Sequence, residues 1–211
     1  MEELITYVRG SHIVFGGASM VFGVLALVLR KSSTQHIRSG VLFFWAMFGV
    51  FITALYLSYM KTIPFLFFVG VFSFYMALIG KFSLSYVRGK SISNFHKAVH
   101  FLAAVVHAGM LVFAFFSSGT LMILCLIFGG LGFLFSMQSL RDLFRKSLAR
   151  NYWLGKHISG MVGAFIASIS AFSVVTFGFL PALVQWLWPT FVLTPIIIYW
   201  QRKVNPKKKS S

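Results

Sequence analysis

The sequence predicts an all-α integral membrane protein with seven transmembrane helices, forming a single domain over residues 1–211. Of the 211 residues, 58% are hydrophobic and only 10% are charged, and the mean hydropathy is +0.86. Apolar runs of roughly eighteen residues or more recur, and each can cross a hydrocarbon layer of about 30 Å at about 1.5 Å per residue. Almost no length remains for a water-soluble domain, which excludes a soluble globular protein.

Basic or turn-forming segments separate the apolar runs and define the predicted spans. Arg30–Gly40 lies between the first two runs, and Lys61–Pro64 forms a tight turn in which Pro64 suits the first turn of the third helix. Lys81–Lys97 and Arg141–Lys156 are expected to be basic loops. The predicted spans are residues 12–29, 41–60, 63–80, 98–116, 120–140, 158–180 and 182–200.

The basic residues predict the orientation of the protein. Only Arg9 and Lys61 of the 19 Lys and Arg residues fall on one side of this topology, and the other 17 fall on the opposite side. Because Lys and Arg are retained in cytoplasmic loops, we expect the N-terminus outside and the C-terminus in the cytoplasm. Glu2 and Glu3 precede the first run and no A-x-A site follows it, which indicates that this run is not a cleaved signal peptide.

The net charge of +16 lies mostly beside the spans. Basic residues in that position set the topology and contact anionic lipid head groups. We therefore expect the lipid bilayer and its anionic head groups as partners and no nucleic acid, while the sequence identifies no protein partner.

Three histidines share one face of the predicted fourth helix. At about 100° per residue, His96, His100 and His107 lie at about 0°, 40° and 20° around the helix axis. Ala103 and Ala114 continue this face with little bulk, which leaves room for a flat group. His107 lies well inside an apolar run, where an ionisable residue indicates a functional site.

Histidines at matching depths suggest a bound cofactor. The topology places His36, His100 and His157 at one level near the cytoplasmic side, and a neutral imidazole there can ligate a metal or a haem iron. The leading hypothesis is a haem b between His100 and His157, with His36 as an alternative ligand. His12 and His107 would form a second pair, and two haems would make a transmembrane electron path. Zinc is the less favoured cofactor.

Each histidine also has a structural interpretation. Histidines at span ends commonly contact lipid head groups or helix ends, which applies to His12, His36 and His96. His107 would then bond a hydroxyl or carbonyl group of a neighbouring helix.

Two other function classes remain open. The first is a small-molecule transporter or membrane-embedded binding protein, in which Gly129–Gly132, the prolines of the seventh helix and Gln185 would shape a cavity. The second is a zinc-dependent membrane hydrolase, which usually needs a carboxylate as ligand orienter or general base. The only acids are Glu2, Glu3 and Asp142, and none lies inside a predicted span. Asp142 is expected in the loop, paired with Arg145 or Arg141.

Small residues one turn apart predict where helices approach closely. They form one face of the first span and one face of the sixth, made of Gly16, Ser19 and Gly23 and of Gly160, Ala164 and Ser168.

Several motifs together resemble a known family. They include His12-Ile-Val-Phe-Gly16, His36-Ile-Arg38-Ser-Gly40 and a longer segment that contains Trp153, His157 and Met161-Val-Gly163-Ala164. Leu180-Pro181, Trp188-Pro189-Thr190 and Pro195 then follow in the order that the family shows. Over most of its length the chain resembles an uncharacterised family of predicted bacterial multipass membrane proteins, classed as a domain of unknown function.

This resemblance implies a bacterial inner-membrane protein of unestablished activity. It places His12, His36 and His157 in motifs but implies no substrate, cofactor or mechanism. The family commonly has arginine directly after the second-helix histidine, whereas here Ile37 intervenes and Arg38 follows.

Overall fold

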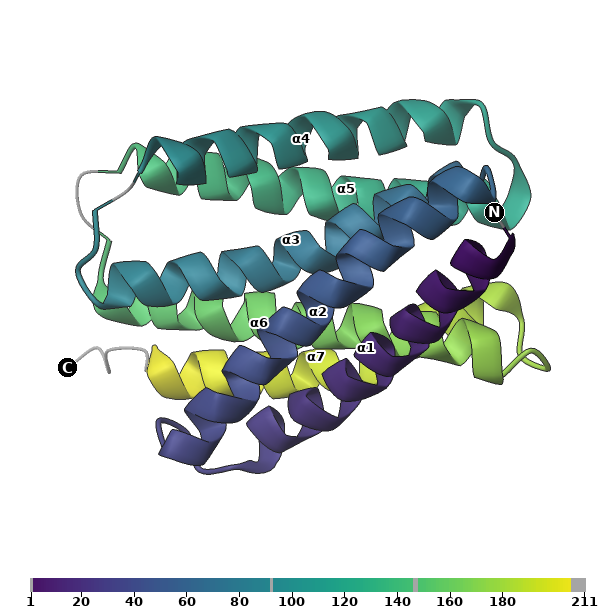
Figure 1. The fold of residues 1–211 in the computed structure, drawn as a ribbon. Helices are drawn as coiled ribbons and strands as arrows, with labels where there is room; N and C mark the ends of the chain where they lie inside the picture. The colour runs from purple at the N-terminus through teal and green to yellow at the C-terminus, as the bar shows by residue number, and fades with distance from the viewer. Residues whose placement is uncertain (1, 92, 146–147, 206–211) are drawn as a thin grey trace.

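The computed structural model describes residues 2–91, 93–145 and 148–205, and in this part of the chain every regular element is a helix (Figure 1). All seven described helices are long and apolar enough to cross a membrane, which confirms the predicted class and number of elements. The helices are α1 (Glu2–Val28), α2 (Thr34–Met60), α3 (Pro64–Val87), α4 (Asn94–Phe115), α5 (Gly119–Leu143), α6 (Arg150–Thr176) and α7 (Ala182–Val204).

Most helices extend beyond the predicted spans, and they do so mainly where the chain becomes polar. The predicted spans end at the first charged side chains, because hydropathy defines them. The helices themselves continue for as long as backbone N–H and C=O groups can pair. His12, expected to open the first span, therefore lies about three turns inside α1. The sixth helix instead ends early, at Thr176, because the turn that leads to Pro181 follows it.

The helices alternate in direction, so the connections lie at two ends of the bundle (Figure 1). We call the end where α1, α3, α5 and α7 finish and α2, α4 and α6 begin the basic end. Ser33 and Ser93 accept hydrogen bonds from the backbone N–H groups of His36 and His96, and so cap α2 and α4 at this end. At the opposite end Pro64 occupies the first turn of α3, as predicted.

Lys31, in the connection between α1 and α2, bonds to backbone carbonyl groups in the last turn of α1. Its ammonium group donates to the carbonyl oxygens of Ala26 and Leu27 and lies 5.2 Å from the centre of the Trp200 ring. Partial burial lowers the pKa of Lys31 from its ordinary value.

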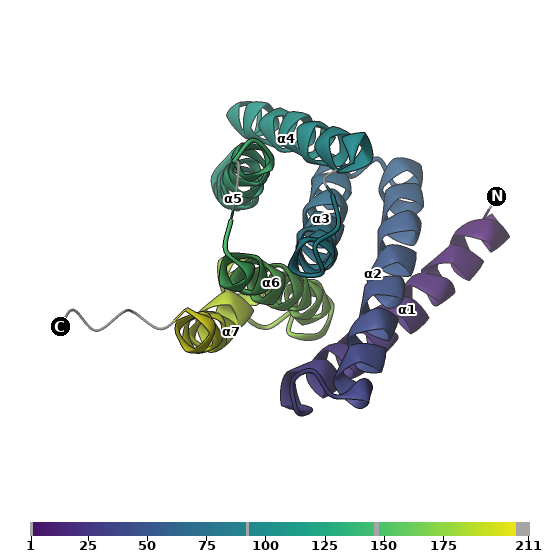
Figure 2. The same cartoon turned by 90° about the vertical axis from the view of Figure 1, so that its left-hand side faces the viewer.

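Helix α3 is the centre of the bundle. It packs against α2, α4, α5 and α6, and Figure 2 shows it between α4 on one side and α6 on the other. The α1–α2 pair packs on the rest of the bundle through α2 on α3 and through α1 on α6. Helices α5 and α6 are not among the packed helix pairs of the described residues.

The small residues mark close helix contacts, as predicted, except Gly16, where nothing lies within 4 Å of an added Cβ atom. The Ser19 and Ser168 hydroxyl groups lie 2.7 Å apart, so the small faces of α1 and α6 meet. A Cβ atom added to Gly23 would overlap the ring of Phe165 on α6. Gly160 lies directly against the backbone of α3 at Met76 and Gly80.

Candidate functional site

A buried ion pair lies at the basic end of the bundle. The Lys156 ammonium group on α6 is 2.6 Å from a carboxylate oxygen of Asp142 on α5. The Asp142 side chain is only 2% exposed and that of Lys156 only 12% exposed. Two opposite charges this deeply buried are costly unless they pair and their remaining polar atoms are bonded.

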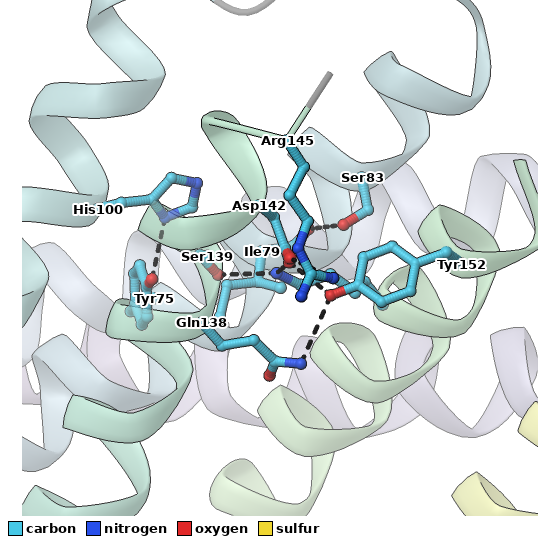
Figure 3. A network of polar contacts seen from close by, with 10 residues as sticks. Tyr75, Ile79, Ser83, His100, Gln138, Ser139, Asp142, Arg145 and Tyr152 are labelled. Carbon is cyan, nitrogen blue, oxygen red and sulfur yellow. Dashed lines mark hydrogen bonds and ion pairs between the residues drawn. The ribbon is translucent and has the colours of Figure 1, made fainter. Parts of the chain in front are cut away.

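Neighbouring side chains complete the hydrogen bonding of the pair (Figure 3). The Tyr152 hydroxyl donates to the same Asp142 oxygen at 2.6 Å, and Lys156 donates to the Ser139 hydroxyl at 3.0 Å. Tyr152 and Lys156 are four residues apart, so they project from one face of α6. Since α5 extends to Leu143 and α6 begins at Arg150, both partners of the pair are helical.

The expected loop position of Asp142 was wrong, whereas its expected pairing with Arg145 is confirmed as the longer of two ion pairs. Asp142 belongs to the last turn of α5, and its closest cation is Lys156 rather than Arg141 or Arg145. The Arg145 guanidinium is 4.0 Å away and 60% exposed. One signal in the sequence indicated a helical face: Ser136, Ser139 and Asp142 recur every third residue. The cation comes from the next helix, and no local pattern identifies it.

His100 lies beside this ion pair. Its Nδ1 atom is 2.9 Å from the Tyr75 hydroxyl of α3, and the imidazole is 3% exposed. His100, Ser139 and Lys156 line a cavity of about 10 Å³, together with Ser83 and Tyr86 of α3. A polar cavity of this volume has room for about one water molecule.

His107 lies deeper in the bundle on the same face of α4. It is fully buried, with Nδ1 3.3 Å from the Ser136 hydroxyl, and its Nε2 atom has no hydrogen-bond partner among the described residues. Its ring lies against Gly132, where an added Cβ would overlap it, and near the rings of Phe72 and Tyr75. His100 and His107 therefore point from α4 into the bundle, and Gly132 on α5 leaves room for the His107 ring.

The remaining predicted ligands have individual partners. Nδ1 of His36 is 2.9 Å from the Ala26 carbonyl oxygen, and Nδ1 of His157 is 2.9 Å from the Gly80 carbonyl oxygen. Because a carbonyl oxygen only accepts, both Nδ1 atoms carry the proton and donate it. Nδ1 of His12 is 2.8 Å from the Thr53 hydroxyl.

The histidines that were expected to share a cofactor lie on different helices. Helix α3 lies between His100 on α4 and His157 on α6, and each of the two bonds to α3 (Figure 2). His36 lies on α2 and His157 on α6, which are not among the packed helix pairs of the described residues. His12 and His107 lie on α1 and α4, which are not a packed helix pair in the described chain. Within residues 2–91, 93–145 and 148–205, no group of three or more His, Cys, Asp or Glu side chains is placed to hold a metal ion.

A cleft of about 610 Å³ opens between α5 and the start of α6. Sequence reasoning missed it, because it depends on two helices that are consecutive in the chain yet do not pack together. Phe133, Leu134 and Met137 form its apolar part, and Gln138, Arg141, Asp142, Arg145 and Tyr152 form its polar part. The cleft adjoins the ion pair, because Asp142 of the pair and Tyr152, which donates to Asp142, both line it.

Gln185 was expected to shape a ligand cavity, but its side chain bonds to the backbone of the connection between α6 and α7. Its amide donates to the carbonyl oxygens of Phe177 at 3.0 Å and Leu180 at 2.6 Å. It therefore stabilises the connection between α6 and α7.

The fold defines the class of protein: a bundle whose seven described helices each have the length and composition of a membrane span. No family model, curated protein or solved structure matches the chain. Inferences about function therefore depend on the buried ion pair, the histidines and the cleft.

Proposed function

We propose that the protein is a membrane-embedded binding protein or transporter for a small amphipathic anion, bound in the cleft between α5 and α6. The observation that carries this proposal is the division of the cleft into an apolar part and a cationic part. Its volume of about 610 Å³ suits a small molecule, since ligand cavities are typically about 300–1,000 Å³.

The charges of the cleft favour an anion. Among the described residues here, the single carboxylate of Asp142 pairs with Lys156 at 2.6 Å and with the exposed Arg145 at 4.0 Å, so Lys156, Arg141 and Arg145 together carry two more positive charges than Asp142 balances. Guanidinium groups bind carboxylates, sulfonates and phosphates through paired hydrogen bonds. Gln138 and Tyr152 add neutral hydrogen-bonding groups, and an alkyl chain fits along Phe133, Leu134 and Met137.

We further propose a bacterial inner membrane as the location, with the N-terminus outside and the basic end in the cytoplasm. The positions of Arg9 and Lys61 at the end opposite to most basic residues support this orientation.

Cysteine labelling in intact cells tests this orientation. In protein that also carries Cys125→Ser, a membrane-impermeant maleimide should label Lys61→Cys and leave Lys90→Cys unlabelled. The reverse pattern would contradict the orientation.

Anion binding tests the proposed function. We expect protein in zwitterionic-lipid nanodiscs to bind decanesulfonate saturably in isothermal titration calorimetry. Arg141→Gln with Arg145→Gln should weaken this binding at least tenfold, because each lost charge-assisted hydrogen bond removes about 1.5–3 kcal/mol. Arg88→Gln, an exposed arginine outside the cleft, is the matched control. Equal affinity in the double variant, or no binding beyond that of empty nanodiscs, would refute the proposal.

Haem or metal binding by histidine is a second candidate function, with His36 and His157 as the ligands. Ligating histidines usually donate one ring N–H to a carbonyl or carboxylate group, and both residues do so through Nδ1. This arrangement leaves both Nε2 atoms free of a proton. His100 instead shares its Nδ1 with Tyr75 on the other side of α3.

Reconstitution with haemin tests this second function. We expect a Soret band with bis-histidine features that is lost in His157→Ala and retained in His12→Ala, whose imidazole lies on α1. A folded preparation without any haem spectrum after reconstitution would contradict haem binding.

A further inference from the structure

We propose that anion binding in the cleft is coupled to the uptake of one proton by a buried chain of polar side chains. This inference rests on the proposed function and names its coupling ion. The chain, called the polar chain below, consists of Asp142, Lys156, Ser139, His100, Tyr75, Ser136 and His107.

The polar chain runs from the cleft toward the middle of α4 in two segments, one from Asp142 to Tyr75 and one from Ser136 to His107. Lys156 joins Asp142 to Ser139 at 2.6 and 3.0 Å. The cavity of about 10 Å³ then joins Ser139 and Lys156 to His100 through the volume of one water molecule. Tyr75 follows His100 at 2.9 Å, and Ser136 leads to His107 at 3.3 Å. Ser136 and Ser139 lie three residues apart on α5, so their hydroxyl groups share one side of that helix.

The members of the polar chain can accept and pass on a proton. Hydroxyl and neutral imidazole groups each have both a donor and an acceptor site. Nε2 of His107 is a buried polar atom without a hydrogen-bond partner among the described residues, and His107 is fully buried. Ionisable groups in such positions within membrane spans typically mark proton relays.

Tyr152 connects the cleft to the chain. It lines the cleft and also donates its only hydroxyl proton to Asp142 at 2.6 Å. A phenol has one donor, so an anion that accepts the Tyr152 proton removes a hydrogen bond from the Asp142 carboxylate. The anion also competes for the positive charge of Lys156. Asp142 is then a buried carboxylate with incomplete compensation, which is costly in a low-dielectric site.

A proton taken from solution removes this cost. One anion and one proton enter together without net charge, and the proton binds the Asp142 carboxylate. Ionisable groups that surround the chain come from all four adjoining helices and from the end of α5: Tyr86 on α3, His96 on α4, Arg141 on α5, Arg145 just after α5, and Tyr152 on α6. The two arginines are exposed, so water screens their effect on the buried carboxylate.

The number of protons taken up per anion tests this inference. Decanesulfonate remains ionised near neutral pH, so any proton counted belongs to the protein. Titration calorimetry in two buffers with different ionisation heats should give an uptake of about one proton. By linkage, the affinity of the wild-type protein should fall about tenfold for each pH unit above neutrality.

Variants locate the proton. Asp142→Asn should bind decanesulfonate without proton uptake and with an affinity independent of pH, whereas the exposed carboxylate variant Glu3→Gln should match the wild type. If Asp142→Asn does not fold, Tyr152→Phe is the alternative variant. It keeps the ion pair and should take up less than one proton per anion. Saturable binding by the wild type with no proton uptake would overturn this inference and leave the proposed function standing. Absence of binding would overturn both.

Discussion

Replacement of Lys156 by methionine is expected to destabilise the bundle by about 3–5 kcal/mol, the largest effect that we predict for a single substitution. Methionine retains most of the apolar stem of lysine but removes the ammonium group 2.6 Å from Asp142. Among the described residues, the carboxylate, which is only 2% exposed, then keeps the Tyr152 hydroxyl at 2.6 Å and the exposed Arg145 guanidinium at 4.0 Å. The free energy of unfolding in mixed micelles of detergent and sodium dodecyl sulfate measures this loss.

Two further variants separate the ion pair from general effects of the substitution. Lys90→Met changes an exposed lysine and should leave stability within about 0.5 kcal/mol. Lys156→Met combined with Asp142→Leu should recover most of the lost stability, because removal of both charges leaves no uncompensated carboxylate. If Lys156→Met and Lys90→Met have the same stability, the ion pair is not buried as described.

Gly160→Ala is expected to destabilise the contact between α3 and α6 by about 1–3 kcal/mol. A Cβ atom at this position would lie 2.5 Å from the Gly80 nitrogen and 2.7 Å from the Met76 carbonyl oxygen. Both are backbone atoms of α3, so no side-chain rotation relieves the overlap and the two helices must separate. The change also displaces the start of α6, which carries Lys156. Thermal unfolding in detergent measures the effect.

Gly130→Ala is the matched control for this substitution. Nothing lies within 4 Å of a Cβ atom added at Gly130, and alanine favours a helix over glycine by up to about 1 kcal/mol. The control should therefore be neutral or slightly more stable than the wild type. Equal melting temperatures for Gly160→Ala and Gly130→Ala would contradict the close packing of α3 on α6.

Local patterns in the sequence predict much of the architecture. The apolar runs predict seven helices, and the spacing of His100 and His107 predicts that both face one direction, which proves to be the interior. The small residues of α1 and α6 predict the contact that Ser19 and Ser168 make. These features depend on helical periodicity within one segment, and the sequence displays that periodicity directly.

The features that depend on neighbouring helices could not be predicted in this way. No pattern in the sequence indicates that α3 lies between α4, which carries His100, and α6, which carries His157. Asp142 resembles a loop residue because its compensating cation lies on the next helix, fourteen residues further along the chain. Tyr75 likewise lies in a continuous apolar segment, and only the packing of α3 on α4 reveals it as the partner of His100.

The central claim is that the cleft between α5 and α6 selects an amphipathic anion. Titration calorimetry with decanesulfonate and with decyltrimethylammonium tests it most directly, because the two probes share a chain length and differ in the sign of their charge. We predict that the wild-type protein binds decanesulfonate at least tenfold more tightly and that Arg141→Gln with Arg145→Gln abolishes this preference. Equal affinities of the wild type for the two probes, or a preference that survives loss of both arginines, would contradict the account.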